Sequence, residues 1–229
     1  MHTKQRSNFG VALVLLATVV ALNSSSLQLH DYGVVALTHP QERELKPQLD
    51  RLLRNLRFGN ESERSAAKDL LIDLSKKSAS ARAQLIENLL KLIQCPSGSA
   101  GFVRNPTLYL EWKQATQLVG LIKAQEAIYD LIQCLDCNDG VFLLSPDAFP
   151  ATRAVIEIGE KAIPNLSREF RKGTTLRKYL AAVALSQMGG EKARVVLEAA
   201  ARTEKDRELA LTFRNFLENW QNSKTSKSQ

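Results

Sequence analysis

Cys134 and Cys137 form a C-x-x-C pair, and they are the residues of this sequence whose types and spacing most directly suggest chemistry. Such a pair serves thiol–disulfide exchange when one thiol has a lowered pKa, for example at the N-terminus of a helix. Here the apolar periodicity places Cys134 in the last turns of a helix, where the helix dipole disfavours a thiolate. No strand pattern typical of a thioredoxin-like site surrounds the pair. A redox activity of these cysteines is therefore the alternative hypothesis and not the principal one.

A third cysteine, Cys95, gives the cysteines a structural interpretation. The tetrapeptide LIQC occurs at 92–95 and again at 131–134, so Cys95 and Cys134 end two equivalent helices. Neighbouring helices lie about 8–10 Å apart, which exceeds the ~7 Å between Cα atoms that a disulfide spans. Because Cys95 and Cys134 occupy equivalent positions on neighbouring helices, we expect a Cys95–Cys137 or a Cys134–Cys137 disulfide in preference to a Cys95–Cys134 disulfide. Three buried, reduced thiols are the remaining alternative.

Motifs for metal, cofactor or nucleophile chemistry do not occur in the sequence. It contains no HExxH or doubled CxxC, no GxxxxGK phosphate loop, no GxGxxG fingerprint and no GxSxG elbow. We therefore expect no metal, no cofactor and no catalytic residue. Acids at helical spacing, such as Asp69 and Asp73, are interpreted as solvated surface residues.

A cluster of basic residues is the candidate binding site. It falls within eleven positions that contain a single acid, Glu169. The cluster predicts a ridge that binds an anionic partner. The alternative is a helix C-terminus stabilised by cations and followed by a solvated loop. The members are Arg168, Arg171, Lys172, Arg177 and Lys178.

The first 26 residues predict a signal peptide. Lys4 and Arg6 precede the apolar residues 9–22, which lead into small polar residues. As a helix, this apolar run would reach about 21 Å, short of the ~30 Å hydrocarbon core of a membrane. We therefore expect an exported protein, periplasmic or secreted. An inner-membrane anchor formed by residues 9–22 is the alternative.

The charge of the chain bears on its partners. The formal net charge of the 229 residues is +7, and removal of residues 1–26, which carry two positive charges and no acid, reduces it to +5. Export argues against nucleic acid as the natural partner. We expect the partner to be another protein, with anionic envelope components as the alternative. Contact with a membrane is expected only through an uncleaved N-terminus.

Helices are predicted through almost the whole chain after a linker over residues 27–40. Leu, Ala, Lys, Glu and Arg dominate, and these residues favour helix. Residues 41–220 form one helical domain, interrupted by stretches rich in Gly and Pro at 95–106 and 138–150. The polar residues 221–229 are predicted to be a disordered tail.

Local signals set several helix boundaries. The first helix of the domain is expected to begin near Pro47 and to stop at Gly59. The next begins at Asn60, with Glu63 three residues later as in a capping box, and Ser80 can cap a third. One later stripe of inward-facing residues is expected to contain Leu108, Trp112, Ala115, Leu118 and Val119.

Three segments resemble one another, and each consists of a helix of small residues, a glycine and a second amphipathic helix. They begin at Ala115, Ala151 and Ala181. Their glycines, Gly120, Gly159 and Gly189, are separated by 39 and 30 residues, a spacing that suits stacked helix pairs. Each glycine is expected to end its first helix in a left-handed conformation.

The runs AVIEIGEKAIPNL and LAAVALSQMGGEKARVVLEAA resemble HEAT repeats, particularly the short type related to phycocyanobilin lyases. The resemblance covers roughly 108–203, and 62–95 looks like one further, more diverged pair. It implies an α-solenoid whose concave face binds proteins or other extended partners, and it does not by itself imply lyase chemistry. Helices near 47–58 and 206–220 would flank the stack. We therefore predict an all-α fold, a short α-solenoid of about four stacked helix pairs with flanking helices.

The function expected from these features is binding rather than catalysis. The principal hypothesis is a non-catalytic protein-binding scaffold of the cell envelope or secreted space that recognises its partner on the concave face. The alternative is an enzyme, or an enzyme accessory, of lyase or thiol-redox type that uses Cys134 and Cys137.

Overall fold

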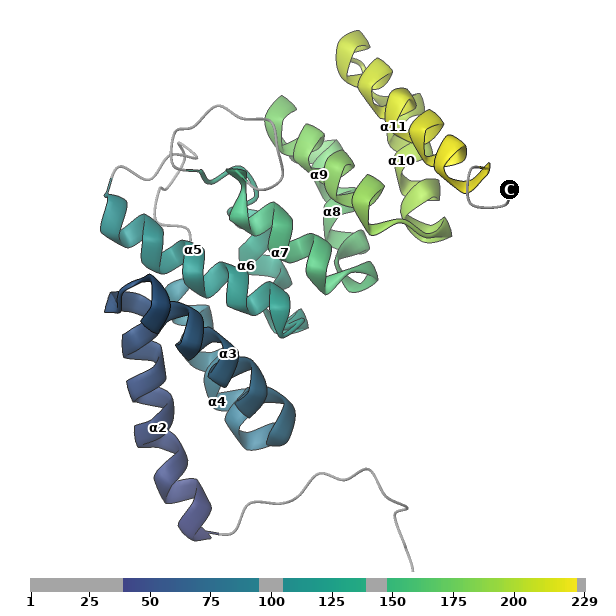
Figure 1. Ribbon diagram of the computed structural model, residues 1–229. Coiled ribbons are helices and arrows are strands. Elements are labelled where there is room, and N and C mark those ends of the chain that lie inside the picture. Colours follow the sequence, from purple (N-terminus) through teal and green to yellow (C-terminus); the bar gives the residue numbers. More distant parts are fainter. Residues whose placement is uncertain (1–38, 95–104, 139–147, 226–229) are drawn as a thin grey trace, which may run out of the picture. The chain divides into compact units, whose positions relative to one another are not determined.

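The fold is all-α, as predicted. The computed structural model describes residues 39–94, 105–138 and 148–225, with the side chains of 39–43 and 221–225 left out of the description, and no strand occurs in these ranges. Figure 1 shows the helices in chain order. They are α2 (His39–Phe58), α3 (Glu61–Lys77), α4 (Ala79–Leu92), α5 (Pro106–Leu121), α6 (Ile128–Gln133), α7 (Pro150–Ile158), α8 (Ile163–Lys172), α9 (Thr175–Met188), α10 (Glu191–Thr203) and α11 (Arg207–Thr225).

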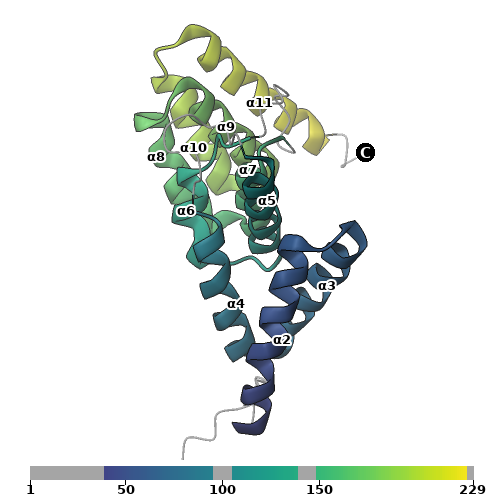
Figure 2. The same cartoon turned by 90° about the vertical axis from the view of Figure 1, so that its left-hand side faces the viewer.

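The helices form stacked pairs, which confirms the predicted architecture. The pairs are α3–α4, α5–α6, α7–α8 and α9–α10. In one layer α5 packs on α7, α7 on α9 and α9 on α11, while in the other α6 packs on α8 and α8 on α10. Figure 2 views the layers from the side, with α4, α6 and α8 along one side and α5 and α7 along the other. Each pair therefore buries its apolar faces against its neighbours, as a solenoid requires.

One hydrophobic core runs through the stack. Its largest completely buried side chains include Trp112, Leu118, Leu131 and Leu166. Small residues let the first-layer helices approach closely, because α7 and α9 present buried alanines to their neighbours. These are Ala151, Ala154, Ala181, Ala182 and Ala184.

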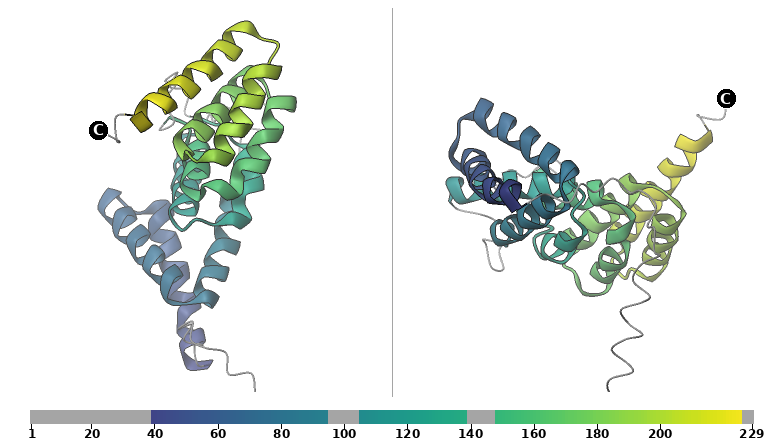
Figure 3. Two further views of the ribbon diagram at one scale, coloured as in Figure 1. Left: turned by 90° about the vertical axis from the view of Figure 1, so that its right-hand side faces the viewer. Right: turned by 90° about the horizontal axis from the view of Figure 1, so that it is seen from below.

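Flanking helices cover both ends of the stack. At the N-terminal end α2 packs on α3 and α5, and at the C-terminal end α11 packs on α9 and α10 (Figure 3). Large apolar side chains of α11 face the core: Leu209, Phe213, Phe216, Leu217 and Trp220. The rings of Phe213 and Phe170 meet edge to face, with centroids 5.3 Å apart. Burial of these aromatic side chains closes the last pair.

The capping signals are partly confirmed. Asn60 and Glu63 form the predicted capping box, in which each side chain accepts a hydrogen bond from the other residue's backbone N–H. The cap predicted at Ser80 was wrong by two residues, since α4 begins at Ala79 and the side chain of Ser78 accepts the N–H of Ala81. Ser78 and Ser80 both lie near this helix start. Ser78 is the cap because it directly precedes the first turn, whose N–H groups have no partner within the helix.

Two boundaries and one stripe member also differ from prediction. The helix expected to begin near Pro47 begins at His39, inside the predicted linker, and buried Leu45 extends its stripe before the proline. At the other end α11 runs to Thr225, so residues 221–225 are helical where a tail over 221–229 was predicted. Leu108 is 51% exposed because it lies in the first turn of α5, before the helix enters the core.

The three repeat glycines play two different roles. Gly159 and Gly189 end α7 and α9 with φ of 82° and 70°, so they have the predicted positive φ, although their ψ values are not those of the left-handed helical region. Their ψ values of −146° and −171° lie in a region that is essentially restricted to glycine. The prediction was wrong for Gly120, which lies inside the last turns of α5, while the residue with positive φ in that turn is Lys123 at 52°. A Cβ at Gly120 would lie 2.7 Å from the Cα of Ala154, so this glycine permits close packing of α5 on α7.

Gly120→Ala tests this packing role. Alanine favours helix by about 1 kcal/mol, but its methyl group would push α7 from α5 at a cost of about 1–3 kcal/mol. We therefore expect no gain in the free energy of unfolding measured with urea, and a net loss of about 1 kcal/mol. Ala83→Gly on the exposed face of α4 gives the scale of helix propensity alone. An increase in stability for Gly120→Ala would contradict the close contact.

Candidate functional site

The five predicted basic residues divide into two groups with different environments. Arg177 and Lys178, at the start of α9, have side chains only 17% and 21% exposed and lie in ion pairs. Arg168, Arg171 and Lys172, on α8, are exposed. The predicted ridge is therefore not one continuous surface, since two of its members turn into the molecule.

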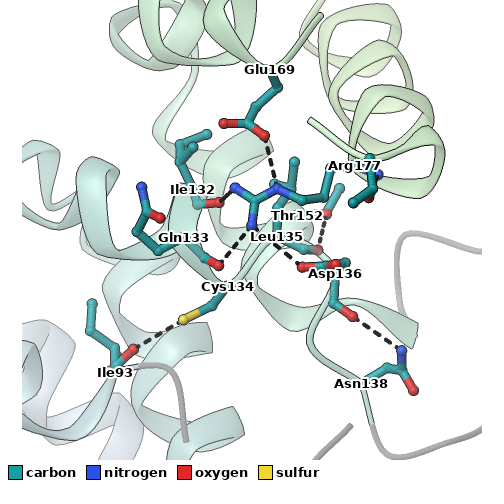
Figure 4. A network of polar contacts seen from close by, with 11 residues as sticks. Ile93, Ile132, Gln133, Cys134, Leu135, Asp136, Asn138, Thr152, Glu169 and Arg177 are labelled. Carbon is teal, nitrogen blue, oxygen red and sulfur yellow. Dashed lines mark hydrogen bonds and ion pairs between the residues drawn. The ribbon is translucent and has the colours of Figure 1, made fainter. Parts of the chain in front are cut away.

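Arg177 joins three helices (Figure 4). Its Nε donates to Glu169 Oε2 at 2.8 Å, and its Nη2 and Nη1 donate to the carbonyl oxygens of Ile132 and Gln133 at 2.6 and 2.9 Å. Nη1 also lies 3.6 Å from Asp136 Oδ1. The last carbonyl groups of a helix have no partner within that helix. The guanidinium of α9 thus caps the end of α6 while it pairs with α8.

Electrostatics fix the charge state of this network. Burial lowers the pKa of Arg177, but the hydrogen bond and charge of Glu169, together with the charge of Asp136, outweigh it and hold the pKa above its ordinary value. Glu169 is buried, with a side chain 11% exposed. One donor of Arg177 serves this carboxylate and the others serve the carbonyl groups of α6, which is possible because arginine supplies five donors in a fixed plane.

Lys178 makes a second buried pair, between α9 and the end of α10. Its Nζ lies 2.8 Å from Glu204 Oε2, and the Glu204 side chain is 5% exposed. Burial by itself raises the pKa of Glu204. Hydrogen bonds from Lys178 and from the backbone N–H of Asp206, together with the charge of Lys178, lower this pKa by more than burial raises it, so it lies below the ordinary 4.5. Arg177 and Lys178 are therefore structural residues.

The exposed surface of α8 is cationic because its one acid points inward. Glu169 is the only acid between Ile163 and Lys172, and Arg177 holds it inside. Within the described part of the chain, Arg168, Arg171 and Lys172 make no ion pair. Spacings of three and four residues place these side chains on adjoining positions of one helix face.

A shallow groove lies beside this cationic surface, between α8 and α10. It has a volume of about 250 Å³. Arg171 forms part of its wall, while exposed Val195 and half-buried Phe170 give it an apolar lining. The other lining residues are Ser167, Val196, Ala199, Ala200 and Thr203.

A second recess lies between α2 and α4 at the other end of the described chain. It consists of two adjoining cavities of about 340 Å³ each that share Asp50, Asn88 and Lys91. Charges of both signs line it, since Arg54 and Arg57 face Asp50 and Glu87. Two of its four cations are engaged, because Lys91 pairs with Glu87 and Arg57 with Glu111. The recess near α8 has the more uniform charge.

The cysteines of the CxxC lie in the core. Cys134 and Cys137 are each 1% exposed, and Cys134 Sγ lies 3.7 Å from the carbonyl oxygen of Ile93. Burial in apolar surroundings disfavours a thiolate and access to it, so the geometry does not favour redox or lyase chemistry. Cys95 lies outside the described residues, and each proposed disulfide pairing stays a prediction.

The repeated LIQC sequence marks equivalent helix ends. In the first copy, the Ile93 carbonyl accepts from Trp112 Nε1 at 3.2 Å, and in the second the Ile132 carbonyl accepts from Arg177. Thr152 Oγ1 donates to the carbonyl of Leu135 at 3.0 Å. Side chains of later repeats thus satisfy the carbonyl groups that end earlier helices.

Sequence reasoning missed the inward role of Glu169. The signal was present, because Ile163, Leu166 and Glu169 are spaced by three residues and share the buried side of α8. A charged residue on an apolar stripe indicates an internal ion pair.

Within 39–94, 105–138 and 148–225, no group of three or more His, Cys, Asp or Glu side chains is placed to hold a metal ion. None of the helices described is long and apolar enough to cross a membrane, and residues 9–22 lie outside that description.

Comparison with known proteins assigns the chain to no family. No protein-family model matches it, and no curated protein is similar to it in sequence.

Arg177→Met tests the structural network. Removing one partner of a buried pair leaves Glu169 uncompensated and should lower the free energy of unfolding by about 3 kcal/mol. Glu169→Gln in the same chain should recover part of that loss. Arg171→Met, at an exposed position, should change stability by less than about 0.5 kcal/mol. Chemical denaturation measures all three, and equal effects at Arg177 and Arg171 would show that the network is not buried in solution.

The lowered pKa of Glu204 predicts a pH dependence of stability. The unfolded chain binds a proton at Glu204 more readily than the folded chain does. The contribution of Glu204 to the free energy of unfolding is therefore fully present above the ordinary pKa of 4.5, and it is lost as the pH falls through the pKa of the folded state. Wild type should exceed Glu204→Gln in Tm at neutral pH, and the difference should shrink as the pH falls below 4.5. Glu126→Gln, at an exposed acid, controls for net charge. A Tm difference independent of pH would contradict the ionised pair.

Proposed function

We propose that this protein is a non-catalytic binding module of the extracytoplasmic space. It recognises another protein through the exposed side of α8 and the helices of the same layer, α6 and α10. The observation that carries the proposal is the separation of charges around α8. Its one acid is engaged inside by Arg177, whereas three cations remain on the surface. An exposed field of one sign attracts a partner of the opposite sign.

The scaffold supports binding rather than turnover. Its polar network satisfies helix ends and buried carboxylates, so these groups are occupied by structural contacts. The groove beside the exposed cations contains the hydroxyl groups of Ser167 and Thr203, but its lining includes no His, Cys, Asp or Glu side chain that could act as their general base. The groove between α8 and α10 is open and small, and a cofactor site usually occupies a concave pocket of about 300–1,000 Å³.

The extracytoplasmic location rests on the N-terminal sequence. Residues 1–26 have the basic start, short apolar run and small polar end of a signal peptide. The HEAT-like sequence pattern supports the same function, because it implies a solenoid that binds proteins on its concave face.

A charge-reversed variant tests the proposal. Arg168→Glu, Arg171→Glu and Lys172→Glu together remove the cationic surface without touching Arg177. Protein expressed from the full-length sequence is used as bait in cell-envelope extract. We expect wild type to retain a defined protein that the variant loses.

The matched control has the same change in net charge at exposed cations elsewhere: Lys76→Glu, Arg202→Glu and Arg214→Glu. It should retain the partner, since its α8 is unchanged. Equal capture by the α8 variant and wild type would refute α8 as the binding surface. Equal loss in both variants would indicate only a general charge effect, which salt screens.

A further inference from the structure

We propose that the groove between α8 and α10 binds one amphipathic α-helix of the partner protein, with its apolar stripe in the groove and its acidic side chains over α8. This inference rests on the proposed function and specifies the partner's structure. It commits to a helix that carries acids on one flank only.

The groove is long enough to hold about two turns of a helix. On α10 its lining residues run from Val195 to Thr203 at spacings of three to four residues, which is about 12 Å or two turns. On α8, Ser167, Phe170 and Arg171 form the facing wall. Helices that bind in such grooves present apolar side chains at i, i+3, i+4 and i+7.

The lining exposes apolar surface that a second helix would cover. Val195 is 51% exposed, and Phe170 and Val196 are half-buried. Small Ala199 and Ala200 leave room between these larger side chains for those of a partner. Contiguous exposed apolar surface with a polar border is typical of a protein-binding site.

Charge fixes the orientation of the partner across the groove. The α8 wall carries Arg171, with Arg168 one turn earlier, whereas the lining contributed by α10 contains no charged residue. On α10, Arg194 pairs with both Glu191 and Glu198, so this cluster of three side chains carries a net charge of −1. Acidic residues on the partner are therefore favoured on its α8 side and gain nothing on its α10 side.

A strand or a lipid surface fits these observations less well. The described residues contain no strand whose edge a partner strand could extend. A bilayer would meet Arg171 and Lys172 without needing the groove, since anionic headgroups respond to charge at the surface. Dependence on the groove's apolar residues thus separates a protein helix from an anionic membrane.

The test uses two synthetic helices and the full-length protein. The first peptide has Leu at i, i+3, i+4 and i+7 and Glu along one flank, and the second replaces each Glu by Lys. Fluorescence anisotropy should show binding of the acidic peptide, at least tenfold tighter than that of the basic one. Vesicles of phosphatidylglycerol serve as the membrane probe.

Variants of the groove provide the decisive comparison. Val195→Asn with Ala199→Gln, both at exposed positions of α10 and neither adding a charge, should weaken binding of the acidic peptide at least tenfold while leaving Tm within a few degrees. The Lys76, Arg202 and Arg214 triple variant should bind the peptide within about threefold of wild type once salt screens its net charge. Unchanged peptide binding in the groove variant, or no binding of the acidic peptide, would overturn the inference. So would vesicle binding that exceeds peptide binding and survives in the groove variant.

Failure of this inference can be told from failure of the proposed function. If the groove variant keeps the partner captured from envelope extract and the α8 charge variant loses it, the proposed function stands and the helix-in-groove assignment is wrong. If both variants keep the partner, both are wrong.

Discussion

The guanidinium of Arg177 is the interaction on which the arrangement around α8 depends. It reaches from α9 to two carbonyl groups at the end of α6 and to the buried carboxylate of Glu169 on α8, so one planar cation joins three successive helix pairs. Arginine spreads its donors over three nitrogens in one plane, whereas the three N–H groups of lysine share a single nitrogen. The same contact determines the outer surface, because it turns the only acid of α8 inward and leaves the exposed side of that helix cationic.

Side chains of neighbouring repeats cap helix ends at several places in this stack. Trp112 and Thr152 donate to carbonyl groups that follow α4 and α6, and Arg82 of α4 donates to the carbonyl of Ile122 at the end of α5. Short helices such as α6, with six residues, have few internal hydrogen bonds of their own. Such contacts across repeats fix the position of each pair on the next, beyond what nonspecific apolar packing would specify.

Sequence patterns predicted most of the fold but only part of the site. Apolar periodicity and the repeated glycines gave the helix pairs, since helix and turn signals are local. Gly120 was misassigned because a glycine in a close contact between helices looks the same in sequence as one in a turn. The five cations looked alike in sequence because net charge does not show the direction of a side chain. Only the contacts of Arg177 with α6 and α8, and of Lys178 with Glu204, show that these two residues point inward. The identity of the partner leaves no pattern in the sequence of this chain, so it enters the account only as a proposal.

The most direct test of the account is the affinity of the acidic helix for the double variant Glu169→Gln with Arg177→Met, measured well below its Tm. This variant removes the internal pair but leaves Arg168, Arg171 and Lys172 on the surface. If Arg177 acts only through structure, the folded variant should bind the peptide within about threefold of wild type. A loss as large as that caused by reversing the charges of α8 would contradict the account, because it would mean that Arg177 itself contacts the partner.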